Sequence, residues 1–432
     1  MPQPPPHLGS RFAALFTASS LSNLADGILS IGLGLVVITL TTSPALVSLA
    51  TAAFTLPWLL LSIVAGVVID RSDRRKVIIV ATTLRIGCLG LGAIALAAGF
   101  MNYPLLLVIC FIFGCAEVFA DNAYSVLVPA LVPAPRLAAA NSRILSAQQV
   151  ANNFLGAPLA GFLFALGAAW VFGVPTALCI GALIVIGLGL RGTYRAQKTS
   201  ASQPQNAKQD LKTGLKYLWR HPIFRPLVLS SAVQNMIFSG YFAVFILWVV
   251  GPGSRVQLAE EHYGLLFMML AVGSVIGALT VERILKVFHE IHVLGAAWLI
   301  AVALLVVPLL APNVIAIAAM LLLSGVSNTI GNTVSVSLRQ RLIPNDLLGR
   351  VFGASQMINL GLVPIGTVIA GLISQYAGMP IWFIVAATTG SAVVVITLRA
   401  VPARIIPPAG TAAAPQAPKV GAERCDAPPP QH

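Results

Sequence analysis

The sequence predicts an all-α polytopic membrane protein, with twelve transmembrane helices in two pseudo-symmetric six-helix bundles. Of the 432 residues, 57% are hydrophobic and only 9% are charged, too few polar side chains to cover a soluble protein of this length. Apolar runs long enough to cross a bilayer as helices recur from end to end. The second half of the chain also repeats features of the first, which predicts the division into two bundles.

Turn-forming residues separate the predicted spans. Breaks fall at Thr42-Ser43-Pro44, at Asn102-Tyr103-Pro104 and at Ala311-Pro312-Asn313. The spans cover residues 12–40, 45–69, 78–99, 104–127, 143–166, 170–190, 224–250, 263–281, 290–310, 313–336, 351–374 and 380–399.

The longest polar segment divides the chain into two halves. Residues 191–222 are predicted to form a cytoplasmic linker between an N-terminal bundle over residues 12–190 and a C-terminal bundle over residues 223–401. Residues 1–11 and 402–432 are rich in proline and poor in large apolar residues, so both ends are predicted to be disordered.

The two halves match each other at an offset of about 211 or 212 residues. Gly114-Cys115-Ala116-Glu117 aligns with Gly325-Val326-Ser327-Asn328, and Leu131-Val132-Pro133 aligns with Leu342-Ile343-Pro344. A repeat of six spans keeps its orientation in the membrane, so we expect the halves to be related by an axis along the membrane normal, with a cavity between them.

Basic residues predict the orientation of the chain. With the amino terminus inside, 25 of the 26 Lys and Arg residues fall in cytoplasmic loops and helix ends, and Arg255 falls outside. Positive charge stays on the cytoplasmic side, so both termini are expected in the cytoplasm and the protein in the plasma membrane. The net charge of +13 therefore does not require a nucleic-acid partner.

A charged turn follows the second span. Residues 70–76 carry six charges in seven positions and cannot lie in hydrocarbon, so they predict a tight turn at the membrane face. We expect Asp70 to pair with basic groups near helix ends when the inner side is closed. The predicted cytoplasmic gate comprises Gly66, Asp70, Arg71, Arg74, Arg75 and Arg85.

This turn resembles the signature of the major facilitator superfamily between helices 2 and 3. The matching residues are Gly66, Asp70, Arg71, Arg74 and Arg75. Asp73 stands where the family usually has glycine. Gly156-Ala157-Pro158 with Gly161 resembles a helix-5 motif associated with exporters, and residues 121–162 are similar to the enterobactin-exporter-like and macrolide-efflux-like branch. The resemblance implies a secondary transporter and favours export.

Three of the thirteen acidic residues lie inside apolar spans: Asp26, Glu117 and Asp121. An ionisable group there costs roughly 2.5–3.5 kcal/mol on insertion scales, so each is a candidate for proton coupling. Low dielectric favours the neutral form of a carboxyl, which suits it to bind and release a proton. The alternative for Asp26 is a protonated carboxyl that only joins two helices.

Glu117 and Asp121 are spaced i, i+4 and share one face of a helix. Their counterparts in the second half are Asn328 and Asn332, so titration is predicted to be confined to the first half. The alternative is that Asp121 simply pairs with Arg85, which lies about 13 Å into the third span.

Polar residues in several spans predict a cavity for a moderately large amphipathic molecule, although each one singly suits a helix-to-helix hydrogen bond. The cavity candidates are Asn23, Gln148, Asn152, Gln234, Asn235, Tyr241, Asn328 and Asn332.

The leading hypothesis is proton-coupled efflux, by antiport and alternating access, of a small amphipathic molecule such as a drug, macrolide or siderophore. No cofactor, metal, nucleotide-binding loop or enzymatic site is expected; the proton gradient supplies the energy. The expected partners are the substrate, protons and the lipid bilayer, with the protein a monomer. The alternatives are an uptake symporter of the same fold, and a membrane sensor or scaffold without flux.

Overall fold

The computed structural model describes residues 9–194, 207–251, 253–343 and 345–401. Within these ranges the chain is almost wholly helical, and twelve of its helices are long and apolar enough to cross a membrane. The predicted fold class is therefore confirmed. Residues 1–8 and 402–432, which are predicted to be disordered, lie outside the described residues. The central part of the predicted linker, residues 195–206, also lies outside them.

Each half contributes six spans, and some of them are built from shorter pieces. The first half comprises α1 (Ser10–Leu40), α2 (Pro44–Arg71), α3 (Arg74–Ala97), α4 (Tyr103–Leu131), the 3₁₀ turn η1 (Ala134–Arg136), α5 (Leu137–Gln149), the π-helical η2 (Val150–Gly156), α6 (Ala157–Leu166) and α7 (Trp170–Gly189). The second comprises α8 (Ala207–Arg220), α9 (Phe224–Val249), α10 (Glu260–Leu285), α11 (Glu290–Ala303), the 3₁₀ turn η3 (Leu304–Val306), α12 (Val307–Leu310), α13 (Val314–Leu342), α14 (Asn345–Gly361), α15 (Val363–Tyr376) and α16 (Met379–Ala400).

Side-chain caps begin several spans at the predicted breaks. Ser43 accepts a hydrogen bond from the backbone N–H of Leu46 at 3.4 Å and begins α2. Asn102 accepts from Leu105 at 2.9 Å and begins α4. Asn313 does the same in the repeat, at the start of α13. These side chains satisfy backbone donors that the first helical turn leaves without partners.

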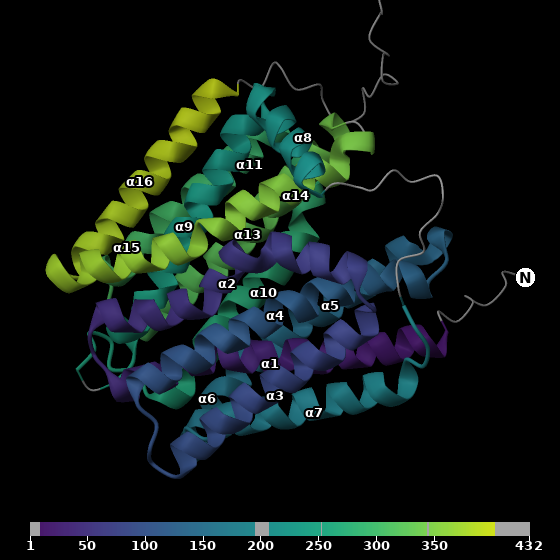
Figure 1. Ribbon diagram of the computed structural model, residues 1–432. Helices are drawn as coiled ribbons and strands as arrows, with labels where there is room; N and C mark the ends of the chain where they lie inside the picture. The colour runs from purple at the N-terminus through teal and green to yellow at the C-terminus, as the bar shows by residue number, and fades with distance from the viewer. Residues whose placement is uncertain (1–8, 195–206, 252, 344, 402–432) are drawn as a thin grey trace, which may run out of the picture.

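The helices form two groups, with most of the first half below and most of the second half above in Figure 1. The face on which α2, α4, α7, α10 and α13 end carries Arg71, Arg136, Arg191 and Lys286, and we call it the basic face. The halves meet through two equivalent pairs of helices, α6 with α10 and α15 with α2. Both contacts lie in the half of the molecule away from the basic face.

Glycine allows the close approach at these two contacts. A Cβ at Gly264 of α10 would collide with the backbone carbonyl of Ala157 in α6, and a Cβ at Gly371 of α15 would collide with Ser48 of α2. Nearby, the hydroxyl of Ser43 donates a hydrogen bond to Gln375 at 2.7 Å. The halves are therefore packed together at the face opposite the basic one.

Replacing Gly264 by leucine is expected to force α6 and α10 apart and to favour the state in which the opposite face is open. The measurement uses a cysteine that replaces Gln356 in a background lacking the five native cysteines. A maleimide added on the side of the basic face labels this cysteine. Labelling should fall by about fivefold or more.

Gly87 provides the matched control, because an added Cβ there meets nothing within 4 Å. Gly87→Leu should label as the parent does. Equal labelling of the Gly264→Leu and Gly87→Leu variants would show that the contact between α6 and α10 does not hold this state.

Candidate transport site

An ion pair between α1 and α3 lies within the first half. Arg85 is completely buried, and its guanidinium donates a hydrogen bond to the carboxylate of Asp26. Its other terminal nitrogen donates to the Ser22 hydroxyl at 2.6 Å, and the Phe113 ring lies 4.9 Å from the guanidinium carbon. Three neighbours on two helices thus hold the cation away from water.

The alternative in which Asp121 simply pairs with Arg85 is wrong, because the structure pairs Arg85 with Asp26. Arg85 is buried in this pair and does not lie at the charged turn, so its predicted place in the cytoplasmic gate is wrong. Depth along a helix is set by residue number, but the direction of a side chain depends on how the helices pack. Here α1 and α3 both pack against α7, and this arrangement brings Asp26 to Arg85.

Glu117 and Asp121 lie close to this pair on one face of α4, near enough for electrostatic interaction with Arg85. Glu117 is only 8% exposed, and its Oε2 atom has no hydrogen-bond partner. One carboxyl therefore contacts the guanidinium, and two more lie within electrostatic range of it. Arg85 balances one negative charge, so ionising a second carboxyl leaves a buried charge uncompensated, which costs several kcal/mol.

The backbone of η2 fixes α1 beside this cluster. A Cβ on Gly27, the residue after Asp26, would lie 2.6 Å from the Cα of Asn152. The contact is reciprocal, because a Cβ on Gly156 would lie 2.6 Å from Gly27. A π-helical segment has an extra residue per turn and often occurs at functional sites. In this chain the π-helical segment packs against Gly27, the residue after Asp26.

A cavity of about 490 Å³, the N-side cavity, borders the acid cluster. Ser22 and Asp121 belong to both the cluster and the cavity wall, and Val128 near the end of α4 extends the wall toward the basic face. Its polar lining comprises Ser19, Ser22, Asn23, Asp121, Tyr124, Ser125, Asn141 and Gln148.

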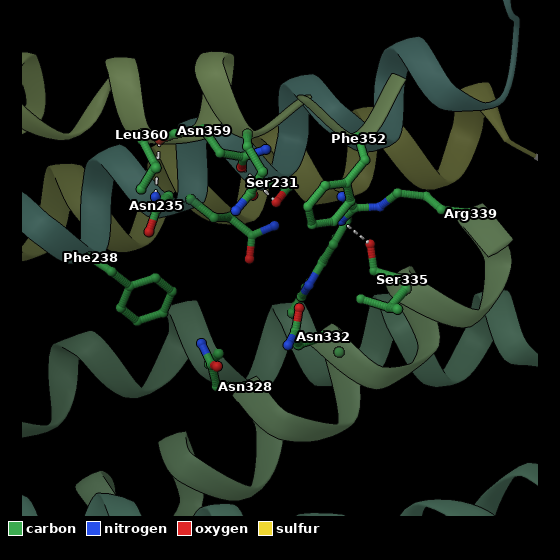
Figure 2. Close-up of a pocket in the computed structure, with 16 residues that line it drawn as sticks. Ser231, Asn235, Phe238, Asn328, Asn332, Ser335, Arg339, Phe352, Asn359 and Leu360 are labelled. Atoms are coloured by element: carbon green, nitrogen blue, oxygen red, sulfur yellow. Dashed lines mark hydrogen bonds between the residues drawn. The ribbon is translucent and has the colours of Figure 1, made fainter. Parts of the chain in front are cut away.

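A second cavity of about 460 Å³, the C-side cavity, lies among α9, α11, α13 and α14. Figure 2 shows Asn235 and Asn359 on one side of it and Asn328 and Asn332 on the other. Phe352 lines both cavities, which places them next to each other between the halves. Amide and aromatic side chains dominate the wall: Gln234, Asn235, Asn328, Asn332, Gln356 and Asn359, with Phe238, Trp298 and Phe352.

Six of the eight cavity candidates lie along these walls. Asn23 and Gln148 line the N-side cavity, and Gln234, Asn235, Asn328 and Asn332 line the C-side cavity. Tyr241 does not line either one, because it is completely buried among aromatic rings and its hydroxyl donates to the Leu305 carbonyl at 3.2 Å. Asn152 instead packs against α1 through its backbone.

One charged residue of the C-side cavity was missed. Arg339 lies seven residues after Asn332, which is two turns along the same face of α13. The charge pattern of the chain places Arg339 with the basic residues of the cytoplasmic boundary. Its spacing from Asn332 was the signal that could have placed it in the cavity.

The charged turn lies at the basic face, as a joint between α2 and α3. Asp70 and Arg71 are exposed there. Arg74 donates to the Val126 carbonyl of α4 at 3.3 Å, and Arg75 donates to the Gly187 carbonyl of α7 at 3.1 Å. No ion pair to Asp70 occurs among the described residues. Its expected pairing belongs to a state in which the basic face is closed, and it stays a prediction.

Asp73 has a structural function at this turn. It is the N-cap of α3, is only 5% exposed, and accepts hydrogen bonds from the backbone N–H groups of Arg75 at 3.0 Å and Tyr194 at 3.2 Å. The residue that departs from the family pattern therefore joins the start of α3 to the segment after α7.

Asp73→Ala is expected to lower the free energy of unfolding by about 1–2 kcal/mol, because two backbone donors lose their acceptor. Thermal unfolding of purified protein in detergent measures the change. Asp70→Ala is the matched control, since this exposed carboxylate caps no helix, and its midpoint should stay at that of the parent. An unchanged midpoint for Asp73→Ala would contradict the capping role.

The family profile described as Major Facilitator Superfamily matches residues 15–360. The chain belongs to this superfamily. The match includes the acid cluster and every residue that lines the two cavities. The chain is therefore a transporter by family, and its twelve apolar helices agree with a multi-pass membrane protein.

Curated relatives include efflux pumps. Macrolide efflux protein A of Streptococcus pyogenes is 22% identical over 393 residues, covering 88% of this chain and 93% of the relative. Multidrug efflux pump Tap of Mycobacterium tuberculosis (strain H37Rv) is 24% identical over 389 residues, covering 87% and 90%. An uncharacterized MFS-type transporter, y4rN of Sinorhizobium fredii, is 26% identical over 366 residues, covering 83% and 87%. The predicted likeness to macrolide-efflux proteins is confirmed.

Solved structures share the fold. The nucleoside transporter NupG has a TM-score of 0.68 at 12% identity, covering 90% of this chain and 98% of that one. A bacterial homologue of the iron transporter ferroportin has a TM-score of 0.70 at 15% identity, with coverage of 90% and 98%. At these identities the likeness concerns the fold alone.

Proposed function

We propose that this chain is a proton-driven exporter of a small amphipathic molecule. It works as a monomer in the plasma membrane, with the basic face and both termini in the cytoplasm, and it needs no bound cofactor. The observation that carries the proposal is the buried Arg85–Asp26 pair with two further carboxyls beside the N-side cavity. The efflux relatives support the direction of transport.

The proposed cycle starts from the state of this structure. The opposite face is closed through α6–α10 and α15–α2, while the N-side cavity extends toward the basic face and receives cargo from the cytoplasm. Closure of the basic face then opens the cavities outward. A proton from outside neutralises Asp26 or a neighbouring carboxyl, cargo leaves, and the protonated cluster returns to the inward-open state.

The ion pair between Arg85 and Asp26 is the element that couples proton binding to cargo transport. Protonation of Asp26 removes its charge, and Arg85 then has only Glu117 and Asp121 as neighbouring carboxyls. Asp121 lines the cavity, so the charge presented to cargo changes with the protonation of the cluster. The protonation of the cluster therefore changes the electrostatic environment of the cargo, and this links proton binding to cargo binding.

Transport into everted membrane vesicles tests the proposal. With an acidified lumen, they should accumulate a fluorescent macrolide to a higher level than vesicles without the protein, which measure the passive trapping of a weak base. Accumulation with an alkaline lumen instead would indicate the uptake symporter. Equal equilibration of a panel of macrolides, drugs and siderophores in vesicles with and without the protein would contradict transport altogether.

A further inference from the structure

Arg339 is a cation in the C-side cavity, and no described residue gives it a carboxylate partner. Its guanidinium donates hydrogen bonds to Ser335 at 2.9 Å and to Ser355 at 3.2 Å. Both serines are buried, and Figure 2 shows Arg339 held beside Ser335 at one end of the cavity. Within the described parts of the chain, no acid forms an ion pair with it.

Two other arginines that are buried or half-buried have acidic partners. Arg85 pairs with Asp26, and Arg341 makes a two-pronged pair with Glu290 at 3.0 and 2.7 Å. A guanidinium has five N–H donors in a planar fork, and two neutral hydroxyls satisfy only part of it. A partly buried cation without a counter-ion is costly. An anion that enters the cavity would neutralise this charge and accept hydrogen bonds from the planar fork.

The other residues of the cavity wall indicate that the anion partner of Arg339 is a ligand and not a side chain of the protein. Neutral amides such as Asn332 and Gln356 surround Arg339, and the cavity wall carries no acid among its described residues. Phe352 and Trp298 add aromatic surface for the apolar part of a molecule. Among the described residues that line the two cavities, Asp121 is the one acid, and it lies on the wall of the N-side cavity. This separation of charge would orient an acidic molecule with its anion toward the second half.

We infer that Arg339 determines specificity, and that the transported molecule is an amphipathic acid whose carboxylate binds this guanidinium in the C-side cavity. The inference rests on the proposed function and narrows its substrate class. Ser335 and Ser355 act as positioning residues, because they hold the fork toward the cavity.

Equilibrium binding to the purified full-length protein in detergent tests the inference. The probes are dansyl-L-phenylalanine, fusidic acid and nalidixic acid, each compared with its own methyl ester. At least one acid should bind about 10–100-fold more tightly than its ester, which corresponds to a charge-assisted hydrogen-bonded pair. Arg339→Gln should remove this preference, and Arg339→Lys should keep part of it because the charge remains without the fork.

Arg399→Gln is the matched control, since it removes an exposed arginine from the last turn of α16 and should preserve the full preference. The ratio of acid to ester is read within each variant, so a general loss of folded protein does not imitate the result. The inference is overturned if no acid binds more tightly than its ester, or if the preference survives in Arg339→Gln. Acid-selective binding without gradient-driven transport would contradict the proposed function alone.

Discussion

Arg85→Met is expected to lower the free energy of unfolding by about 3–5 kcal/mol, the largest stability change in this protein that we predict. The substitution leaves Asp26 without its cation, next to Glu117 and Asp121. It also removes the donor to Ser22 and the cation beside Phe113. Loss of monodisperse protein on heating in detergent, followed over a temperature series, measures the effect.

The double variant Asp26→Asn with Arg85→Met separates charge from packing. With neither charge of the pair present, the midpoint should recover most of the loss, because a neutral pair of similar volume avoids the cost of a lone buried charge. Arg399→Gln, at an exposed arginine, should leave the midpoint unchanged. If Arg85→Met unfolds at the temperature of the parent, the buried pair does not stabilise the folded protein.

Asp26→Asn is expected to reduce gradient-driven transport by roughly tenfold or more, the effect of losing a coupling free energy of about 1–3 kcal/mol. Asparagine keeps the size of the side chain but cannot take up a proton. Exchange of labelled for unlabelled cargo across vesicles without a pH gradient should continue, since neither cavity loses a lining residue.

Asn23→Ala is the matched control for this variant. Asn23 lies one turn from Asp26 on α1 and lines the N-side cavity, and its amide already donates to the Ser19 carbonyl at 2.7 Å. We expect it to alter apparent affinity for cargo while leaving the response to the gradient intact. A gradient response in Asp26→Asn equal to that of the parent would remove Asp26 from the coupling mechanism.

The helices and their repeat follow from the sequence because hydrophobic length and cap residues are local signals. Asn102 and Asn313 begin equivalent helices, and both are recognisable from the chain alone. Gly114 and Gly325, aligned in the repeat, pack α4 against α2 and α13 against α10 in the structure. The repeat therefore predicts packing as well as topology.

The candidate site was only partly predictable. The intramembrane acids can be recognised in the sequence because a charge inside the membrane is energetically costly. The partner of Arg85 depends on how the helices are rotated, and the spacing of residues along the chain does not determine this rotation. The π-helical η2 behind Asp26 is a backbone feature without a local signature. Tyr241 was misplaced because its side chain packs inside the second half, against Phe383 and the Leu305 carbonyl. Arg339 was missed because its charge is equally suited to the membrane boundary.

Proton movement driven by cargo tests the proposed antiport most directly. Liposomes containing the purified protein are loaded with a cargo molecule found in the vesicle screen and with a pH-sensitive dye, and are then diluted into cargo-free buffer of the same pH. As cargo leaves, the lumen should become acidic, and Asp26→Asn should abolish the change. A lumen that becomes alkaline, or that keeps its pH while cargo leaves, would contradict proton-coupled export.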